Sequence, residues 1–222
     1  MKNTIIILVI VALFGGAVVY QNNKARRLSQ ETLVGHDSQP SDYREDLAPV
    51  KDGNFTIDST NSKANWTGKK TIKKDWIDTG TIALKEGNFS ITDGMISSGK
   101  VIFDMNSISV DMTGSGGGQD KLSTHLKSNA FFDVEKFPEA TFAFTKHEAG
   151  NLIGDLTIKG VTKSISIPAT VSSVNNKTHI QGKAVIDRTL FNVKFGSNKF
   201  FDDLKDNVID DTFNLEFDVV AQ

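Results

Sequence analysis

The strongest constraint on the fold is a period-two alternation of apolar and polar residues that begins near Gly53. In the runs Leu152–Ile158, Val161–Val171, Thr178–Ile186 and Phe213–Val219, apolar residues recur at every second position with mostly polar residues between them. Successive side chains of a β-strand point to opposite faces, so each run predicts a strand with one buried and one solvated face. Such one-sided strands are typical of antiparallel sheets rather than of parallel α/β sheets.

Turn signals and one change of phase add detail to this sheet. In Val101–Met112 the apolar positions shift by one at Asn106-Ser107, which predicts a β-bulge in a long, bending strand. About eight or nine strands fit into residues 53–222, the spacing typical of a sandwich or a barrel. The predicted tight turns are Glu86-Gly87-Asn88, Asp93-Gly94, Gly150-Asn151 and Asn175-Asn176.

A glycine-rich loop and a short helix interrupt the strands. Gly114–Gly118 predicts a flexible loop, and Asp120–Ser128 then places Leu122 and Leu126 four residues apart on one amphipathic helical face. The glycine-rich stretch matches neither nucleotide-binding glycine motif, so a loop before a helix is the better interpretation. Two further short helical turns are expected at residues 187–190 and 198–204.

The first fifty residues have a different composition. Residues 5–20 (IIILVIVALFGGAVVY) carry no charge, and a helix of this length would extend about 24 Å, slightly less than a ~30 Å hydrocarbon core. We assign residues 1–21 to a signal peptide or an N-terminal membrane anchor, and we leave cleavage open. Residues 22–52 are polar, contain Pro40 and Pro49, and predict a flexible linker before the domain at 53–222. We therefore expect an exported, periplasmic protein, either free or anchored to the inner membrane.

Several kinds of chemistry are disfavoured by composition and spacing. The chain has no Cys, which excludes thiol catalysis, disulfides and Cys-ligated metals. Its net charge of −2 argues against nucleic-acid binding. The four His residues show no metal-ligand spacing, and no GxSxG motif occurs. A His125–Asp133 acid–base pair is a weaker interpretation than a packing role for His125. We expect no enzymatic activity, no metal and no cofactor.

The aromatic composition of the domain points to an apolar interior. Phe14 is the only one of the fifteen Phe residues before residue 53, and the domain also holds Trp66 and Trp76 but no Tyr. Such an interior suits either an apolar ligand or a packed core, and both interpretations stay open here. Arg188 is the only arginine after residue 52, and it is either a structural tie beside Asp187 or a contact at a channel mouth.

Motifs across the domain resemble the YceI family of lipocalin-like, polyisoprenoid-binding proteins. They are His125–Ser128 (HLKS), Phe131–Val134 (FFDV), Phe137-Pro138 with Thr141-Phe142, Gly154–Lys163 (GDLTIKGVTK), and Ile186–Thr189 (IDRT) before Phe191–Val193 (FNV). The resemblance covers residues 53–222. It implies an all-β fold, an eight-stranded antiparallel lipocalin-like barrel with a short helical insertion, here preceded by an N-terminal apolar helix.

The same resemblance implies a function. Family members hold a long isoprenoid chain, such as a quinone or polyprenol tail, in an internal channel, and they are often exported, often homodimeric and not established as enzymes. One departure is that members commonly carry a His near the second strand, where this chain has Trp76-Ile77-Asp78. Any headgroup preference of the family is therefore not transferred.

We predict that the chain binds an isoprenoid lipid inside the barrel for transport, storage or sequestration. Two alternatives are a stress-response or interaction module with a filled barrel, and a lipid-acting enzyme. The expected partners are the lipid, a membrane through the N-terminal segment, and a second copy of the chain. The predicted ligand-binding residues are Trp66, Trp76, Phe103, Met105, His125, Phe142, Phe144, Leu156, Ile158, Arg188, Phe213 and Phe217.

Overall fold

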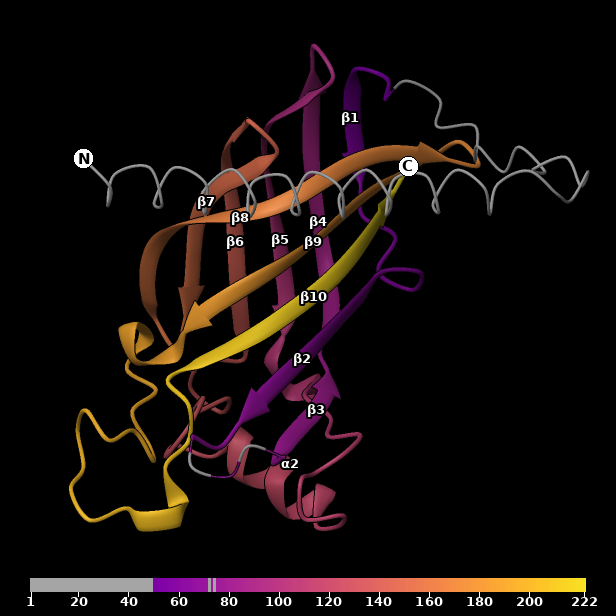
Figure 1. Cartoon of the computed structure of the whole chain (residues 1–222). Coiled ribbons are helices and arrows are strands. Elements are labelled where there is room, and N and C mark those ends of the chain that lie inside the picture. The colour runs from indigo at the N-terminus through magenta and orange to yellow at the C-terminus, as the bar shows by residue number, and fades with distance from the viewer. Residues whose placement is uncertain (1–49, 72, 74) are drawn as a thin grey trace, which may run out of the picture. The chain divides into compact units, whose positions relative to one another are not determined.

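The computed structural model describes residues 50–71, 73 and 75–222 (Figure 1). The predicted signal peptide or anchor and nearly all of the predicted linker lie outside these residues. Within the described part of the chain, no helix has both the length and the apolar character needed to cross a bilayer.

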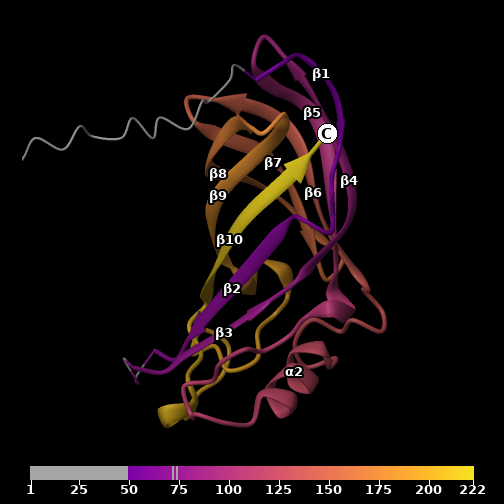
Figure 2. The same cartoon turned by 90° about the vertical axis from the view of Figure 1, so that its right-hand side faces the viewer.

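The domain is built on one antiparallel sheet that curls strongly (Figures 1 and 2). Its spatial order is β1-β4-β5-β6-β7-β8-β9-β10-β2-β3. The all-β, antiparallel prediction is confirmed. The strands are β1 (Gly53–Thr56), β2 (Lys63–Lys69), β3 (Ile77–Thr81), β4 (Ala83–Thr92), β5 (Met95–Asp104), β6 (Glu139–Glu148), β7 (Asn151–Ile158), β8 (Val161–Val174), β9 (Lys177–Asp187) and β10 (Thr212–Ala221).

Ten strand segments take the place of the eight strands expected, because two stretches of chain bend and change partner. β1 pairs with β4, whereas β2, which follows it in sequence, pairs with β10 and β3. Between them, Ile57 forms an isolated bridge with Ala221 at the end of β10. β3 and β4 are separated by Ile82 alone, yet they pair with β2 and β5 respectively. The bends wrap the sheet around an interior.

The other elements are short and gather near one end of the curled sheet (Figure 2). The helix expected over residues 120–128 is confirmed as α2, and the helical turn expected at 187–190 is confirmed as η2. The turn expected at 198–204 is confirmed only at its start, where the N–H groups of Phe200 and Phe201 donate to the Ser197 carbonyl at 3.2 and 3.1 Å, and the 3₁₀ turn η3 lies just after the segment. The bounds are η1 (Met105–Ser107), α2 (Gln119–Lys127), η2 (Arg188–Phe191) and η3 (Lys205–Asn207).

The β-bulge predicted at Asn106-Ser107 is wrong. β5 ends at Asp104, and the phase of the apolar positions changes because the chain enters the 3₁₀ turn η1. The Asp104 carboxylate accepts a hydrogen bond from the Asn106 backbone N–H at 3.0 Å, and the Ser107 hydroxyl donates to the Asp104 carbonyl at 2.6 Å. These local side-chain hydrogen bonds favour a turn over a continuing strand.

The hairpin turns follow the sequence signals in most places. Asp93-Gly94 and Asn175-Asn176 all have positive φ, as two-residue hairpins require. The turn expected at Gly150-Asn151 lies one residue earlier, at Ala149-Gly150, and both of these residues have positive φ. The turn at residues 86–88 is wrong, because these residues lie inside β4. A Cβ on Gly87 would approach the Lys100 carbonyl oxygen to 2.6 Å, so close packing rather than a turn requires this glycine.

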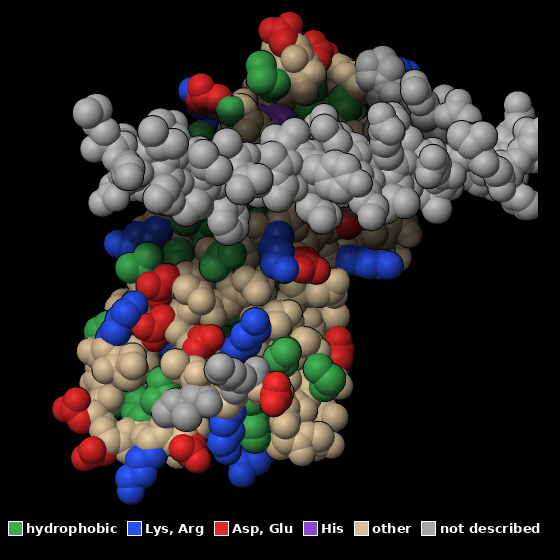
Figure 3. All heavy atoms as spheres, viewed as in Figure 1, with side chains coloured by type: hydrophobic (Ala, Val, Ile, Leu, Met, Phe, Trp, Pro, Cys, Tyr) green, Lys and Arg blue, Asp and Glu red, His purple; other side chains and the backbone are tan. Residues whose placement is uncertain are grey.

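The alternating pattern separates an apolar inner face from a polar outer face. In β7, Leu152, Leu156 and Ile158 are buried, and in β9 the buried positions include Ile180 and Ile186. On the side of the molecule seen in Figure 3, cationic and anionic side chains are interspersed over the lower part of the domain. The sheet therefore directs its hydrophobic side chains inward, where they form a core or border a cavity.

Candidate functional site

A cavity of about 490 Å³ lies between the curled sheet, α2 and the loops around η2 and β10. Its size falls within the ~300–1,000 Å³ typical of ligand pockets. Its apolar wall side chains include Trp66, Trp76, Ile82, Phe103, Met105, Ile108, Leu122, Leu126, Phe131, Phe132, Ala140, Leu156, Ile158, Ile186, Phe195, Ile209, Phe213 and Leu215. The site is therefore suited to an apolar molecule rather than to a polar one.

The structure brings most of the predicted ligand-binding residues together around this cavity. Those that line it are Trp66, Trp76, Phe103, Met105, His125, Leu156, Ile158, Arg188 and Phe213. The exceptions are Phe142, Phe144 and Phe217, which line a separate pocket of only about 40 Å³. Because Phe103 and Leu156 border both spaces, the two adjoin each other.

The interior is packed where the three exceptions lie. The rings of Phe142 and Phe144 meet edge to face with centroids 5.1 Å apart, and Phe89 adds a second such contact to Phe144 at 6.4 Å. A Cβ on Gly182 would lie 2.6 Å from the Phe217 ring, so the glycine gives this ring its space. One part of the interior is thus a packed aromatic core, and the other part is hollow.

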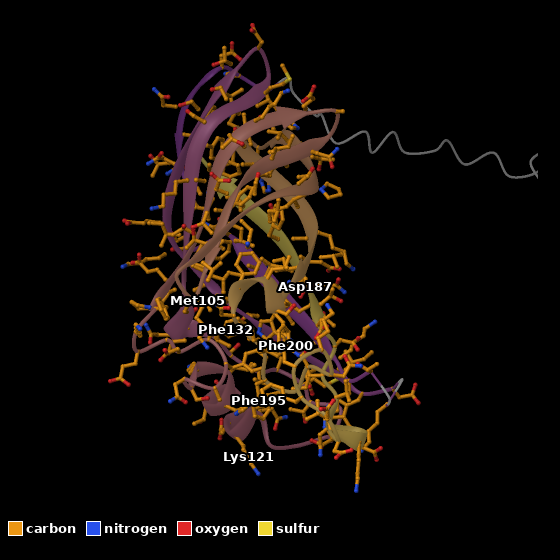
Figure 4. The ribbon with its side chains drawn as sticks, turned by 90° about the vertical axis from the view of Figure 1, so that its left-hand side faces the viewer. Met105, Lys121, Phe132, Asp187, Phe195 and Phe200 are labelled. Carbon is orange, nitrogen blue, oxygen red and sulfur yellow. The ribbon has the colours of Figure 1, made fainter. Side chains whose placement is uncertain are left out.

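Several wall residues come from segments whose sequence pattern does not connect them to the site. Leu122 and Leu126 were predicted to share a helical face, and that face borders the cavity. Phe132 and Phe195 lie in loops without a repeating pattern. Figure 4 shows both between the strand ends and the lower end of the domain, with Lys121 farther out. The one available signal was the concentration of Phe in residues 131–132 and 195–201.

Lys159 holds one of these loops against the sheet. This residue has a φ of 50° in the turn between β7 and β8, and its ammonium donates to the carbonyl oxygens of Phe131 at 2.6 Å and Asn129 at 3.1 Å. Burial lowers the pKa of Lys159, while the nearby Asp133 charge raises it. The lysine thereby fixes the segment that carries Phe131 into the cavity wall.

The two tryptophans are held by specific contacts. Trp66 Nε1 donates to the Ser109 carbonyl at 3.1 Å, and the residue opposite Trp66 in β3 is Gly80. Trp76 Nε1 donates to the Asp78 carboxylate at 3.3 Å, and Lys70 lies over the Trp76 ring at 4.2 Å. Each indole therefore presents an apolar surface to the cavity while its N–H is paired.

The charged residues at the cavity are of both signs. Lys69, Lys70 and Lys121 border it together with Asp78 and Asp210. Lys69 and Lys121 are exposed, so their charges are solvated at the border of the cavity. The lining therefore consists of an apolar wall and a mixed polar border.

Arg188 is buried, with 2% of its surface exposed, and its N–H groups are paired with main-chain carbonyls. Burial lowers the pKa of its guanidinium. The negative charges of nearby carboxylates, that of Asp211 most strongly, oppose this shift. Its four backbone hydrogen bonds account for most of its donors, so its geometry is that of a structural tie at the cavity border. The four hydrogen bonds go to the carbonyl oxygens of Asp210 at 2.9 Å, Val193 at 2.7 Å, Phe195 at 2.9 Å and Ile209 at 3.1 Å.

His125 lies on the cavity-facing side of α2 and differs from Arg188 in its pairing. Its Nε2 atom is buried and has no hydrogen-bond partner among the described residues. Burial lowers the pKa of the His125 imidazole. An acid–base pair formed through Nε2 would require a hydrogen bond between this nitrogen and the Asp133 carboxylate. The structure has no such bond. Across residues 50–71, 73 and 75–222, no group of three His, Asp or Glu side chains is arranged to hold a metal ion.

Comparison with known proteins identifies similar sequences. The family model described as "YceI-like domain" matches residues 55–221. A UPF0312 protein of Vibrio parahaemolyticus is 33% identical over 123 residues, which are 53% of this chain and 59% of that protein. A UPF0312 protein of Shewanella denitrificans is 38% identical over 89 residues, 38% of this chain and 44% of that protein. The chain thus spans about half the length of these curated relatives.

Two solved structures resemble the domain with a TM-score of 0.58 each. BcnA of Burkholderia cenocepacia is 22% identical, and the match covers 75% of this chain and 99% of that one. A polyisoprenoid binding domain from Saccharophagus degradans, implicated in plant cell wall breakdown, is 17% identical, with 76% and 97% covered. At these identities the likeness shows that the fold is shared.

Proposed function

The chain belongs to the YceI-like domain family, and on that premise we propose that it binds a long apolar isoprenoid lipid, of the quinone or polyprenol type, in the cavity beside α2. The observation that carries the proposal is the hollow, largely apolar interior of about 490 Å³. A barrel that served only as a packed interaction module would not need this space. The cavity therefore favours the lipid-binding interpretation over the filled-barrel alternative.

Hydrophobic transfer supplies enough free energy for binding. Burying ten methylene equivalents at ~0.8 kcal/mol each gives about 8 kcal/mol, near micromolar affinity before ordering costs are subtracted. The ligand class comes from the Saccharophagus degradans domain, which is described as polyisoprenoid binding. Because the shared fold alone does not fix a ligand, its transfer to this chain is part of the proposal.

The role proposed is transport, storage or sequestration of the lipid without chemical conversion. We further propose that the protein is exported to the periplasm, and that residues 5–20 direct export or anchor the chain to the inner membrane. Self-association into a homodimer is part of the same proposal. An apolar ligand in a membrane-proximal carrier would have a short path between the bilayer and the cavity.

The test is native mass spectrometry combined with organic extraction of the full chain, purified from a host whose membranes contain quinones and polyprenols. The expected result is a co-purifying prenyl lipid at about one per chain. A control sample is delipidated and re-exposed to the same lipids. A protein that stays free of lipid before and after incubation would show that the cavity is not an isoprenoid site.

A further inference from the structure

The His125 side chain carries a polar atom that the protein leaves without a partner. Nε2 is buried, and it forms no hydrogen bond with any of the described residues. Buried polar atoms in folded proteins nearly always have a hydrogen-bond partner, so this one calls for an explanation. His125 also lines the large cavity, which makes a cavity-bound molecule the available partner.

Aromatic packing fixes the imidazole ring in place. It meets Phe195 edge to face with centroids 4.6 Å apart, and it meets Phe131 in a similar arrangement at 5.8 Å. Both phenylalanines border the cavity and neither offers a polar group. Hydrophobic contacts thus hold the ring in place, and no protein group pairs with its Nε2 atom.

The electrostatic surroundings favour a neutral imidazole. Burial lowers the pKa of His125, so the uncharged ring predominates at neutral pH. The cavity is bordered by Lys121 on α2, by Lys69 and Lys70 on and after β2, and by Arg188 on η2. The opposing carboxylates that border it are Asp78 and Asp210. A neutral imidazole pairs well with a carbonyl or hydroxyl oxygen, whereas counter-charge for a phosphate would have to come from the border lysines and not from His125.

We propose that Nε2 of His125 is the hydrogen-bond partner of an uncharged oxygen, a quinone carbonyl or an alcohol, at the polar end of the bound isoprenoid. The inference rests on the proposed function and adds a preference to it. The cavity selects lipids with a neutral polar terminus over the bare hydrocarbon and over the phosphorylated lipid. His125 acts here as a binding residue and carries out no chemistry.

Three probes with the same C20 isoprenoid chain test this preference: geranylgeraniol, its hydrocarbon lacking the hydroxyl, and geranylgeranyl monophosphate. Dissociation constants are measured by native mass spectrometry for the wild type, His125→Phe and His125→Gln. The wild type is expected to bind the alcohol about tenfold more tightly than the hydrocarbon. His125→Phe should bring that ratio close to one with hydrocarbon affinity retained, whereas His125→Gln, which keeps a neutral hydrogen-bonding group, should restore part of it.

The outcomes separate the two proposals. Failure of all three probes to bind the wild type would overturn the proposed function itself. Binding of alcohol and hydrocarbon with equal affinity, or an unchanged ratio in His125→Phe, would overturn only the role of His125. Tighter binding of the monophosphate than of the alcohol would overturn the neutral-terminus preference and direct attention to the border lysines. The wild-type ratios decide selectivity even where a variant does not fold.

Discussion

Nη1 of Arg188 donates a hydrogen bond to the carbonyl oxygen of Phe195 at 2.9 Å, and this bond joins a buried charge to an aromatic wall of the cavity. The Phe195 ring in turn contacts His125 on α2. The position of the loop that carries Phe195, and hence the shape of the cavity at α2, therefore depends on Arg188, whose N–H groups donate to backbone carbonyls. Arg188 therefore supports the cavity wall through the backbone as well as bordering the cavity itself.

Arg188→Met is expected to destabilise the domain by about 3 kcal/mol or more. The change removes hydrogen bonds to four main-chain carbonyls, and buried acceptors left unpaired are costly. Urea unfolding followed by circular dichroism measures the loss. Lys183→Met is the control, because Lys183 forms an exposed pair with Glu216 and should change stability by no more than about 0.5 kcal/mol. Equal stability of the two variants would show that Arg188 is not a tie.

The sequence was most informative where the pattern reports burial directly. The alternation in residues 152–158 predicted β7 to within one residue, and Leu122 with Leu126 predicted the inward face of α2. It was least informative where glycine has a role in packing. Gly87 resembles a turn residue but lies inside a strand. A glycine is needed there because a Cβ would collide with the neighbouring strand.

The candidate site was predictable only in part, for a physical reason. Alternation tells which residues face inward, but Phe142 and Leu156 share that property, and only packing distinguishes core from cavity wall. Loop residues such as Phe195 carry no periodic signal at all. The pairing of Arg188 and the lack of a partner at His125 depend on tertiary contacts between segments distant in sequence.

Gly80→Ala is expected to destabilise the domain by about 1–3 kcal/mol and to displace the Trp66 indole. A Cβ at this position would lie 1.9 Å from the Ser109 carbonyl oxygen and 2.7 Å from the Trp66 ring, and the strand cannot absorb such overlap freely. Urea unfolding and Trp66 fluorescence in a Trp76→Phe background detect both effects. Gly117→Ala, where the added carbon has nothing within 4 Å, should leave both unchanged. A normal spectrum in Gly80→Ala would contradict the packing argument.

Asp58 is expected to contribute to stability in a pH-dependent way. The hydrogen bond from the Asn61 side chain, followed by that from Lys177, lowers the pKa of Asp58 from 3.8 to about 2. Since the folded pKa lies below the unfolded one, the contribution is complete above about pH 4 and is lost as the pH falls through about 2. Asp58→Asn should therefore flatten the acid limb of the stability curve between these values.

Thermal unfolding at closely spaced pH values checks the Asp58 prediction. Glu135→Gln neutralises an exposed loop carboxylate and serves as the matched control. An acid limb of identical slope in Asp58→Asn and wild type would mean that the Asp58–Lys177 contact, 3.0 Å long, does not couple the segment after β1 to the β8–β9 hairpin.

Ile158→Trp is expected to weaken isoprenoid binding about tenfold while the domain stays folded. Ile158 is buried at the end of β7 and borders the cavity, so a larger apolar side chain occupies space that the lipid would use. Excluding two methylene equivalents costs about 1.6 kcal/mol of binding free energy, which corresponds to roughly tenfold. Native mass spectrometry with geranylgeraniol measures the affinity, and thermal unfolding checks the fold.

The matched control for Ile158→Trp is Val185→Trp. Val185 is 67% exposed on β9, so the same indole is added on the outer face and lipid affinity should not change. A loss of affinity confined to Ile158→Trp locates the lipid in the cavity, since both variants add an indole in place of a β-branched aliphatic side chain and differ in the face they alter. If Ile158→Trp binds as the wild type does, the lipid must lie elsewhere, because an apolar chain cannot share volume with a buried indole.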